Sequence, residues 1–254
     1  MAEKPHTPSY RLGVFVFLLL AFLTALEFVL SLWLNVWQLL ALVAVIKAGL
    51  VLYYYMHIYR LFVSDPEADH ESYVYKLATN RMGLWLFFIS DLFLFGGLMI
   101  ARFNLLQLTH PDLNQVVGLI VTGVLLLSSF FANRGETAMA RGDRKQFLIS
   151  IGVTMLLGIL FLVGVIGVEW QIAPFGPGDG VQGAIFYSMT GFHAFHVLTG
   201  VVFLFIVLRN GLRDRYSAEK HWGVEACVVY WHFVDVVWVF FFPALYLIGK
   251  VFGS

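Results

Sequence analysis

Seven ionisable side chains lie well inside long apolar stretches of this 254-residue chain, away from their ends. They are Glu27, Lys47, Asp91, His193, His196, His232 and Asp235. Such groups are costly to bury in hydrocarbon, so they commonly pair with one another or mark a functional site. The residue types allow three chemistries: ion pairs that lock helix packing, a carboxylate–histidine proton relay, and histidine ligation of haem or copper.

Depth within each apolar stretch can be counted at about 1.5 Å per helical residue. The count places Asp91 and His193 near the midplane, with Asp235 at a similar level. We therefore expect Asp91 and His193 to hydrogen-bond between their helices, either as packing or as part of proton or oxygen supply. The count also brings His196 and His232 level, which suits either a bridging haem or two hydrogen-bonded interior histidines.

The first two apolar stretches carry Glu27 and Lys47, whose depths differ by about 6 Å at this rise per residue. A lysine side chain spans that distance. We expect the two to form an ion pair within an N-terminal hairpin, because each alone would cost about 3 kcal/mol to insert. The alternative for Lys47 is snorkelling toward the membrane surface.

Composition fixes the protein class. Hydrophobic residues make up 60% of the chain and charged residues 13%, against about 25% charged in soluble domains. About 20 apolar residues span a bilayer as a helix, which predicts an all-α, polytopic bundle of seven transmembrane helices. The seven stretches are near Leu12–Leu34, Trp37–Tyr59, Met82–Phe103, Gln115–Asn133, Phe147–Val168, Gly183–Leu208 and Ala226–Gly249.

The 16 lysines and arginines fall mainly at the N-terminus and in alternate loops. Only Arg102 and Lys250 belong to the opposite side, and Lys47 lies within a stretch. The positive-inside rule then predicts a cytoplasmic N-terminus and an outside C-terminus, which needs an odd number of spans. The first stretch has no cleavage signal, so we expect it to be retained.

The polar stretch Ser64–Lys76 suggests a division into a hairpin (1–62), a linker (63–80) and a five-helix domain (81–254), although an ordinary long loop is the alternative. The net charge of zero gives no case for nucleic acid binding. The single cysteine, Cys227, excludes an intrachain disulfide and a cysteine-based metal site.

Three segments carry a family resemblance. The runs GFHAFHVLTGVVFL (191–204), HWGVEACVVYWHFVDVVWVFFFPALYL (221–247) and MGLWLFFISDLFLFGGLM (82–99) resemble subunit III of haem–copper cytochrome c oxidases, and the likeness covers about residues 78–252. That family commonly has glutamate after the serine of its third-helix motif. Here Asp91 follows Ser90, with the same charge and one methylene less reach.

The N-terminal hairpin instead resembles the small subunit IV of bacterial oxidases. The likeness rests on TALEFV (24–29) and IKAGLVLYYYMHIY (46–59). The matching positions are Lys47, Ala48, Val51, Met56 and His57. The resemblance predicts a natural fusion of a subunit IV-like hairpin to a five-helix subunit III.

The resemblance implies an accessory subunit of a proton-pumping terminal oxidase in a bacterial plasma (inner) membrane. Such a subunit binds no metal or haem itself, since haem and copper belong to partner subunits I and II. It holds phospholipid, supports proton uptake, oxygen access and turnover stability, and could join a larger respiratory supercomplex. At the cytoplasmic edge, Arg213, His221 and Glu225 are the expected lipid headgroup contacts, unless they are only positive-inside charge.

Other functions stay open at this stage. The same fold could serve a quinol oxidase or a relative associated with nitric oxide reductase, because the electron donor is chosen by subunits I and II. An independent transporter or a di-haem cytochrome is a third class. Transporters often show repeated halves and helices broken at the midplane, and the sequence shows neither.

Overall fold

The computed structural model describes residues 10–33, 37–56 and 73–251. Long helices dominate this part of the chain. They are α1 (Tyr10–Trp33), α2 (Trp37–Leu50), α3 (Tyr73–Leu106), α4 (Gln115–Ala140), α5 (Arg144–Leu162), the short α6 (Trp170–Ile172), α7 (Gly180–Leu212) and α8 (Trp222–Phe242). Two-residue strands β1 (Thr109–His110) and β2 (Lys250–Val251) pair in parallel.

Three helices end in π-helical segments, in which each hydrogen bond spans one residue more than in an α-helix. These are η1 (Val51–Tyr55) after α2, η3 (Val163–Glu169) between α5 and α6, and η4 (Pro243–Leu247) after α8. Pro243 has no backbone N–H and cannot continue the α-helical ladder, so η4 begins at this residue. Gly249, at φ +100°, then turns the chain against the backbone of Leu108.

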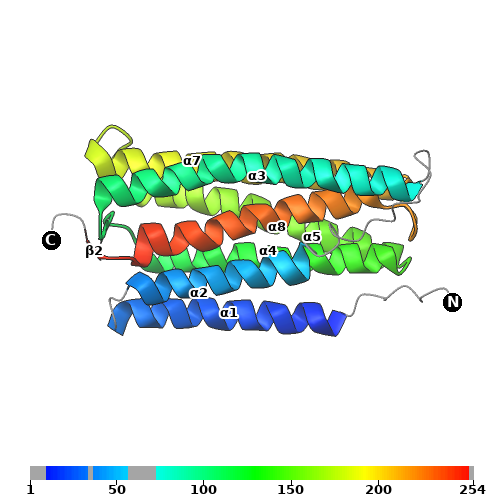
Figure 1. The fold of residues 1–254 in the computed structure, drawn as a ribbon, viewed down its shortest axis with the longest axis horizontal. Helices are drawn as coiled ribbons and strands as arrows, with labels where there is room; N and C mark the ends of the chain where they lie inside the picture. Colours follow the sequence, from blue (N-terminus) through cyan, green and yellow to red (C-terminus); the bar gives the residue numbers. More distant parts are fainter. Residues whose placement is uncertain (1–9, 34–36, 57–72, 252–254) are drawn as a thin grey trace.

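Within the described ranges, seven helices are long and apolar enough to cross a membrane. The predicted all-α, seven-helix bundle is therefore confirmed, and the chain is a multi-pass membrane protein. The helices lie side by side along the long axis of the molecule (Figure 1). The predicted orientation of the termini stays a prediction.

The last helix lies at the centre of the bundle. Of its membrane-spanning window, 94% is buried, whereas the figure for α3 is 11%. α1 and α2 pack together and contact α4 and α8, and α3 and α7 lie on the opposite side (Figure 1). Two ends of the bundle are distinguished below: the C-terminal end, where α8 ends, and the opposite end, where α8 begins.

Several helices extend beyond the apolar stretches. α3 begins at Tyr73, inside the segment expected as linker, and α4 continues through Arg134 to Ala140. Hydropathy marks only the part of a helix within hydrocarbon, and polar turns continue into the headgroup region. The expected linker up to residue 72, and His57, lie outside the described residues.

Candidate functional site

A carboxylate–histidine pair joins α3 to α7. His196 Nε2 lies 3.4 Å from Asp91 Oδ2, and the two side chains are 11% and 17% exposed. The other ring nitrogen, Nδ1, is 2.7 Å from the carbonyl oxygen of Phe192, so it carries the hydrogen. Nε2 is thus the ring nitrogen that faces Asp91, but Asp91 Oδ2 has no hydrogen-bond partner among the described residues in this arrangement. The two groups are close neighbours that a small side-chain movement would bring into hydrogen-bond geometry.

The expected partner of Asp91 was His193, and this prediction is wrong. His193 is fully buried, with its ring 4.8 Å from that of Trp238 and 5.6 Å from that of Phe161. Neither ring nitrogen has a hydrogen-bond partner among the described residues. Counting residues gives the depth of a side chain but not its direction around the helix, and α7 turns His193 toward α5 and α8.

A second polar cluster lies between α4 and α8. Ser129 Oγ is 2.6 Å from His232 Nδ1 and donates a hydrogen bond to Asp235 Oδ2. Because the hydroxyl hydrogen goes to Asp235, His232 Nδ1 must donate to Ser129. The ring of Tyr55, in η1, packs 4.8 Å from that of His232. All four residues are buried.

These contacts separate the histidines that could have shared a haem. His196 faces Asp91 and Phe95 on α3, whereas His232 faces Ser129 on α4 and Tyr55. Among the described residues, no group of three or more histidine, cysteine, aspartate or glutamate side chains is arranged to hold a metal ion.

The hairpin contains the expected contact between its two charged residues. Lys47 Nζ donates to Glu27 Oε2, and each side chain is at most 1% exposed. Nearby, the hydroxyl of Tyr55 donates to the carbonyl oxygen of Gly13 at 3.0 Å, which links η1 to α1. The structure thus brings Glu27 and Lys47 together inside the protein, away from lipid.

The three residues expected to hold lipid headgroups lie at the end of the bundle where α7 finishes and α8 begins. Glu225 accepts two hydrogen bonds from Arg81 on α3, at 2.9 and 3.0 Å. Arg213 follows α7 and is exposed, and His221 precedes α8 with Nδ1 3.2 Å from the carbonyl oxygen of Ser217. Glu225 is thus tied to α3, whereas His221 contacts its own loop.

An apolar groove of about 450 Å³ opens beside this ion pair, between α3, α7 and α8. Leu84 and Phe87 form one wall, Phe203 and Ile206 the second, and Cys227 the base. Leu84 lies one helical turn from Arg81, so a charged group and an apolar channel are adjacent. The groove is apolar and large enough for a hydrocarbon chain, and the charge of Arg81 beside it is neutralised by Glu225.

Arg102, at the end of the third apolar stretch, was counted with the loop that follows it, and the structure buries it completely. Its guanidinium donates to four backbone carbonyl oxygens, at 2.6 to 3.2 Å. They belong to Gln107, Thr109, Ala244 and Ile248. The side chain ties the end of α3 to η4. A cation at the edge of an apolar stretch was the only sequence signal.

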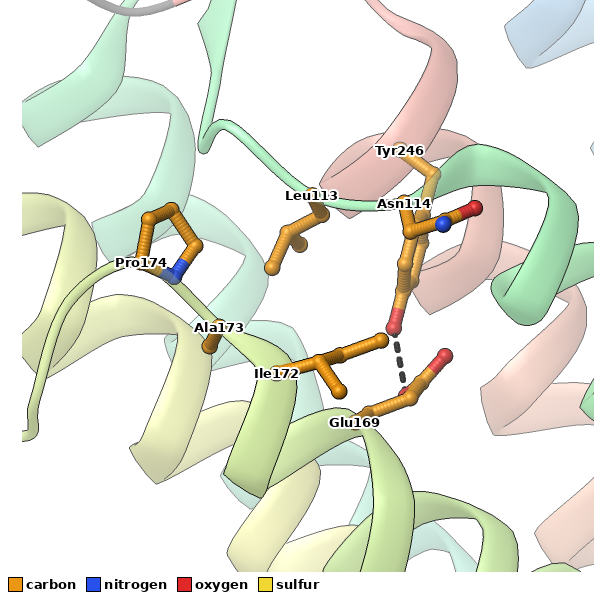
Figure 2. Close-up of a pocket in the computed structure, with 7 residues that line it drawn as sticks. All are labelled: Leu113, Asn114, Glu169, Ile172, Ala173, Pro174 and Tyr246. Carbon is orange, nitrogen blue, oxygen red and sulfur yellow. Dashed lines mark hydrogen bonds between the residues drawn. The ribbon is translucent and has the colours of Figure 1, made fainter.

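Glu169 was also missed, because the fifth apolar stretch was ended at Val168. Its Oε2 accepts a hydrogen bond from the hydroxyl of Tyr246 at 2.8 Å, across η3 and η4 (Figure 2). In the adjoining loop, burial lowers the pKa of His110, and its contact with the carbonyl oxygen of Pro111 partly opposes that effect.

Comparison with known proteins decides the family. The sequence model of the family described as cytochrome c oxidase subunit III matches residues 7–250. The chain belongs to the cytochrome c oxidase subunit III family. The expected resemblance is thereby confirmed for subunit III, and the match includes the N-terminal hairpin. The likeness of that hairpin to subunit IV stays a prediction.

Individual relatives agree with the family match. Cytochrome c oxidase subunit 3 of Gadus morhua is 36% identical over 183 residues, which are 67% of this chain and 70% of the relative. The Cyprinus carpio protein is 35% identical and that of Tetraodon nigroviridis 36%, with the same coverage. This chain is therefore similar to subunits of an oxidase complex.

Proposed function

We propose that this chain is a non-catalytic subunit of a haem–copper terminal oxidase, in which it packs on subunit I and neighbours subunit II. Family membership carries the proposal. The structure supports it through α3, whose spanning window is only 11% buried within the chain and therefore has room for a partner or lipid. The subunit binds no haem or copper, and electrons from cytochrome c pass through its partners. A bacterial plasma membrane is the proposed location.

The copurification test is direct. Tagged full-length chain, solubilised from membranes in mild detergent, should bring subunits I and II with it and consume oxygen with reduced cytochrome c. Oxidation of quinol but not of cytochrome c would assign the chain to a quinol oxidase instead. A monomer free of haem-containing partners would contradict the proposal. A reporter fused after residue 254 tests the orientation, and activity confined to the cytoplasm would reverse it.

Within this role, the Asp91–His196 pair is the proposed functional site. It lies on the least covered of the described spanning helices, it is partly exposed, and its carboxylate and imidazole are 3.4 Å apart, so a small movement would let them share a proton. A pair of this kind at the boundary with subunit I could return protons to that subunit during turnover. Packing of α3 on α7 is the alternative role.

One substitution distinguishes proton supply from packing of α3 on α7. Asp91→Asn removes the exchangeable proton and keeps a polar side chain of the same size. If the pair supplies protons, the variant complex should assemble with normal subunit content but turn over more slowly or inactivate after fewer cycles. Asp112→Asn, at an exposed site, is the control. Unchanged turnover over many cycles would leave packing as the role.

We also propose that the groove beside Arg81 and Glu225 holds a phospholipid acyl chain. Its walls are apolar, and Arg213 and His221 lie at the same end of the bundle for the headgroup. Ala226→Trp should fill the groove and reduce the lipid that native mass spectrometry detects on the complex. Leu92→Trp, exposed on α3 outside the groove, is the matched control. Equal lipid retention by both variants would contradict this proposal.

A further inference from the structure

A small pocket lies at the C-terminal end of the bundle, where η3 and α6 meet η4 and the loop before α4 (Figure 2). Its volume is about 20 Å³. One water molecule needs about 10–15 Å³ by the same kind of measure, so the pocket accommodates a single water. Two of its lining residues, Asn114 and Pro174, are exposed, so the pocket lies at the surface of the chain.

The floor of this pocket is a carboxyl group. Glu169 is only 4% exposed, and its two oxygens differ. Oε2 accepts the hydrogen bond from Tyr246, whereas Oε1 is buried without a hydrogen-bond partner among the described residues. An ionised oxygen in that state is costly, and a protonated one still needs an acceptor for its hydrogen. As placed, Oε1 has almost no surface open to the pocket, but a small rotation of the carboxyl group would bring it to a water molecule there, which would satisfy Oε1 in both states.

The backbone that positions this carboxyl is unusual. Glu169 is the last residue of η3, and Tyr246 lies in η4. Such π-helical segments are rare and are frequently found at functional sites. Outside the pocket, the side-chain amide of Gln115 donates to the carbonyl oxygen of Tyr246 at 2.8 Å, and Arg102 binds that of Ala244. Tyr246 is therefore held in place independently of Glu169.

We propose that Glu169 is a proton-binding site that exchanges with the aqueous phase at the C-terminal end of the bundle through one water molecule in this pocket. In the protonated form, Oε1–H donates to the water and Oε2 is the carbonyl oxygen that accepts from Tyr246. On release, the Oε1–H bond breaks, the water takes the proton and passes it to bulk solvent, and the carboxylate remains. Tyr246 keeps its proton throughout.

Few other groups can interfere with this exchange. Of the residues that line the pocket in the described structure, Glu169 and Tyr246 are the titratable ones. The remaining lining residues are Leu113, Asn114, Ile172, Ala173 and Pro174. The inference does not depend on the oxidase role, since it rests only on this pocket and on the aqueous phase beside it.

Infrared difference spectroscopy of the purified complex with the full-length chain tests the proposal. A pH titration should reveal a protonated-carboxyl C=O band that shifts in D₂O and is lost in Glu169→Gln. Tyr246→Phe should move this band to higher frequency, because the carbonyl oxygen loses its hydrogen bond. If Glu169→Gln does not assemble, the Tyr246→Phe shift assigns the band instead.

A pair of variants tests whether the carboxyl hydrogen of Glu169 exchanges through the pocket. Ile172→Phe places a larger side chain in the pocket (Figure 2) and should slow exchange of the carboxyl hydrogen with D₂O. Val168→Phe, exposed and outside the pocket, should exchange at the wild-type rate. The absence of a titrating band from Glu169 would overturn the proposal. Equal rates of carboxyl hydrogen exchange in the two variants would also overturn it. A carboxyl band whose midpoint changes with Na⁺ concentration at fixed pH would indicate a cation site and would overturn it as well.

Discussion

α8 and α3 both carry an aspartate that contacts a histidine, yet the chain surrounds them in opposite ways. α8 is enclosed by its neighbours, and the buried Asp235 accepts a hydrogen bond from Ser129 and lies 3.6 Å from His232. α3 is covered on one side only, and Asp91 remains 17% exposed. The difference indicates that the polar groups of α8 stabilise this subunit, whereas those of α3 are available to whatever covers it.

The glycines that face α8 differ from those of α3 in the same way, because only the first group is in close contact with a neighbouring helix. A Cβ added at Gly158 of α5 or Gly200 of α7 would overlap the ring of Trp231 on α8. At Gly96 and Gly97 of α3, an added Cβ would meet nothing within 4 Å. Small residues let helix backbones approach closely in membranes. The glycines around α8 have that role inside the chain, and those of α3 leave room for a neighbour outside it.

The largest predicted effect concerns another enclosed contact, the Glu27–Lys47 pair. Glu27→Leu leaves Lys47 charged and buried without its partner, which should cost about 3–5 kcal/mol in free energy of unfolding. Adding Lys47→Met should recover most of that loss, since an apolar pair of similar volume is tolerated. Unfolding in mixed micelles measures both. Additive losses in the double variant would contradict a coupled pair.

Asp235→Ala should cost about 2–4 kcal/mol, because it creates a cavity and removes the acceptor of the Ser129 hydroxyl. Asp91→Ala should cost less than Asp235→Ala in the isolated subunit, because Asp91 is 17% exposed and its removal leaves a smaller cavity. The loss of stability of each variant, relative to the parent subunit, is measured by thermal unfolding under the same conditions. Equal losses would remove the distinction between α8 and α3.

Gly200→Ala should destabilise the subunit by about 1–3 kcal/mol, because the methyl group and Trp231 would compete for the same space. Gly97→Ala should be neutral or stabilising by up to about 1 kcal/mol in the isolated chain, since alanine is the better helix former. The same Gly97→Ala variant should weaken copurification with subunit I if that helix packs there. Normal assembly would instead place lipid against Gly97.

Asp91→Glu is the smallest change proposed. The added methylene lets the carboxylate approach His196 Nε2 more closely than the present 3.4 Å. We expect stability to change by less than about 0.5 kcal/mol, as for most exposed substitutions. Turnover lifetime should equal or exceed that of the parent complex. A shorter lifetime would show that the reach of aspartate is adapted to its site.

The sequence was sufficient to predict the seven helices, because apolar stretches of membrane-spanning length seldom occur in proteins outside a bilayer. It also indicated the proximity of Glu27 and Lys47, which needs only depth and reach. It was not sufficient for the partner of Asp91: His193 and His196 differ little in depth, and only the packing of α7 decides which of them faces α3.

Other members of the polar clusters gave weaker sequence signals. Ser129 is uncharged and lies in an apolar stretch, so nothing marks it as the link between His232 and Asp235. Arg102 and Glu169 lie at the ends of apolar stretches, where charged residues usually reach water. Their burial depends on η4, which continues α8 at this end of the bundle and supplies the carbonyl oxygen of Ala244 and the side chain of Tyr246.

The central position of α8 has a consequence for biosynthesis. Ribosomes deliver α1 to α7 first, so six membrane-spanning helices enter the bilayer before the helix that fills their centre exists. Until α8 is inserted, the hydroxyl of Ser128 lacks its donor, the indole N–H of Trp231. The hydroxyl of Ser129 likewise lacks its acceptor, the carboxylate of Asp235. A nascent chain interrupted before α8 therefore shows polar groups and open grooves to lipid, where quality-control proteases can recognise it. Translation of the last helix completes the core and conceals that signal in one step.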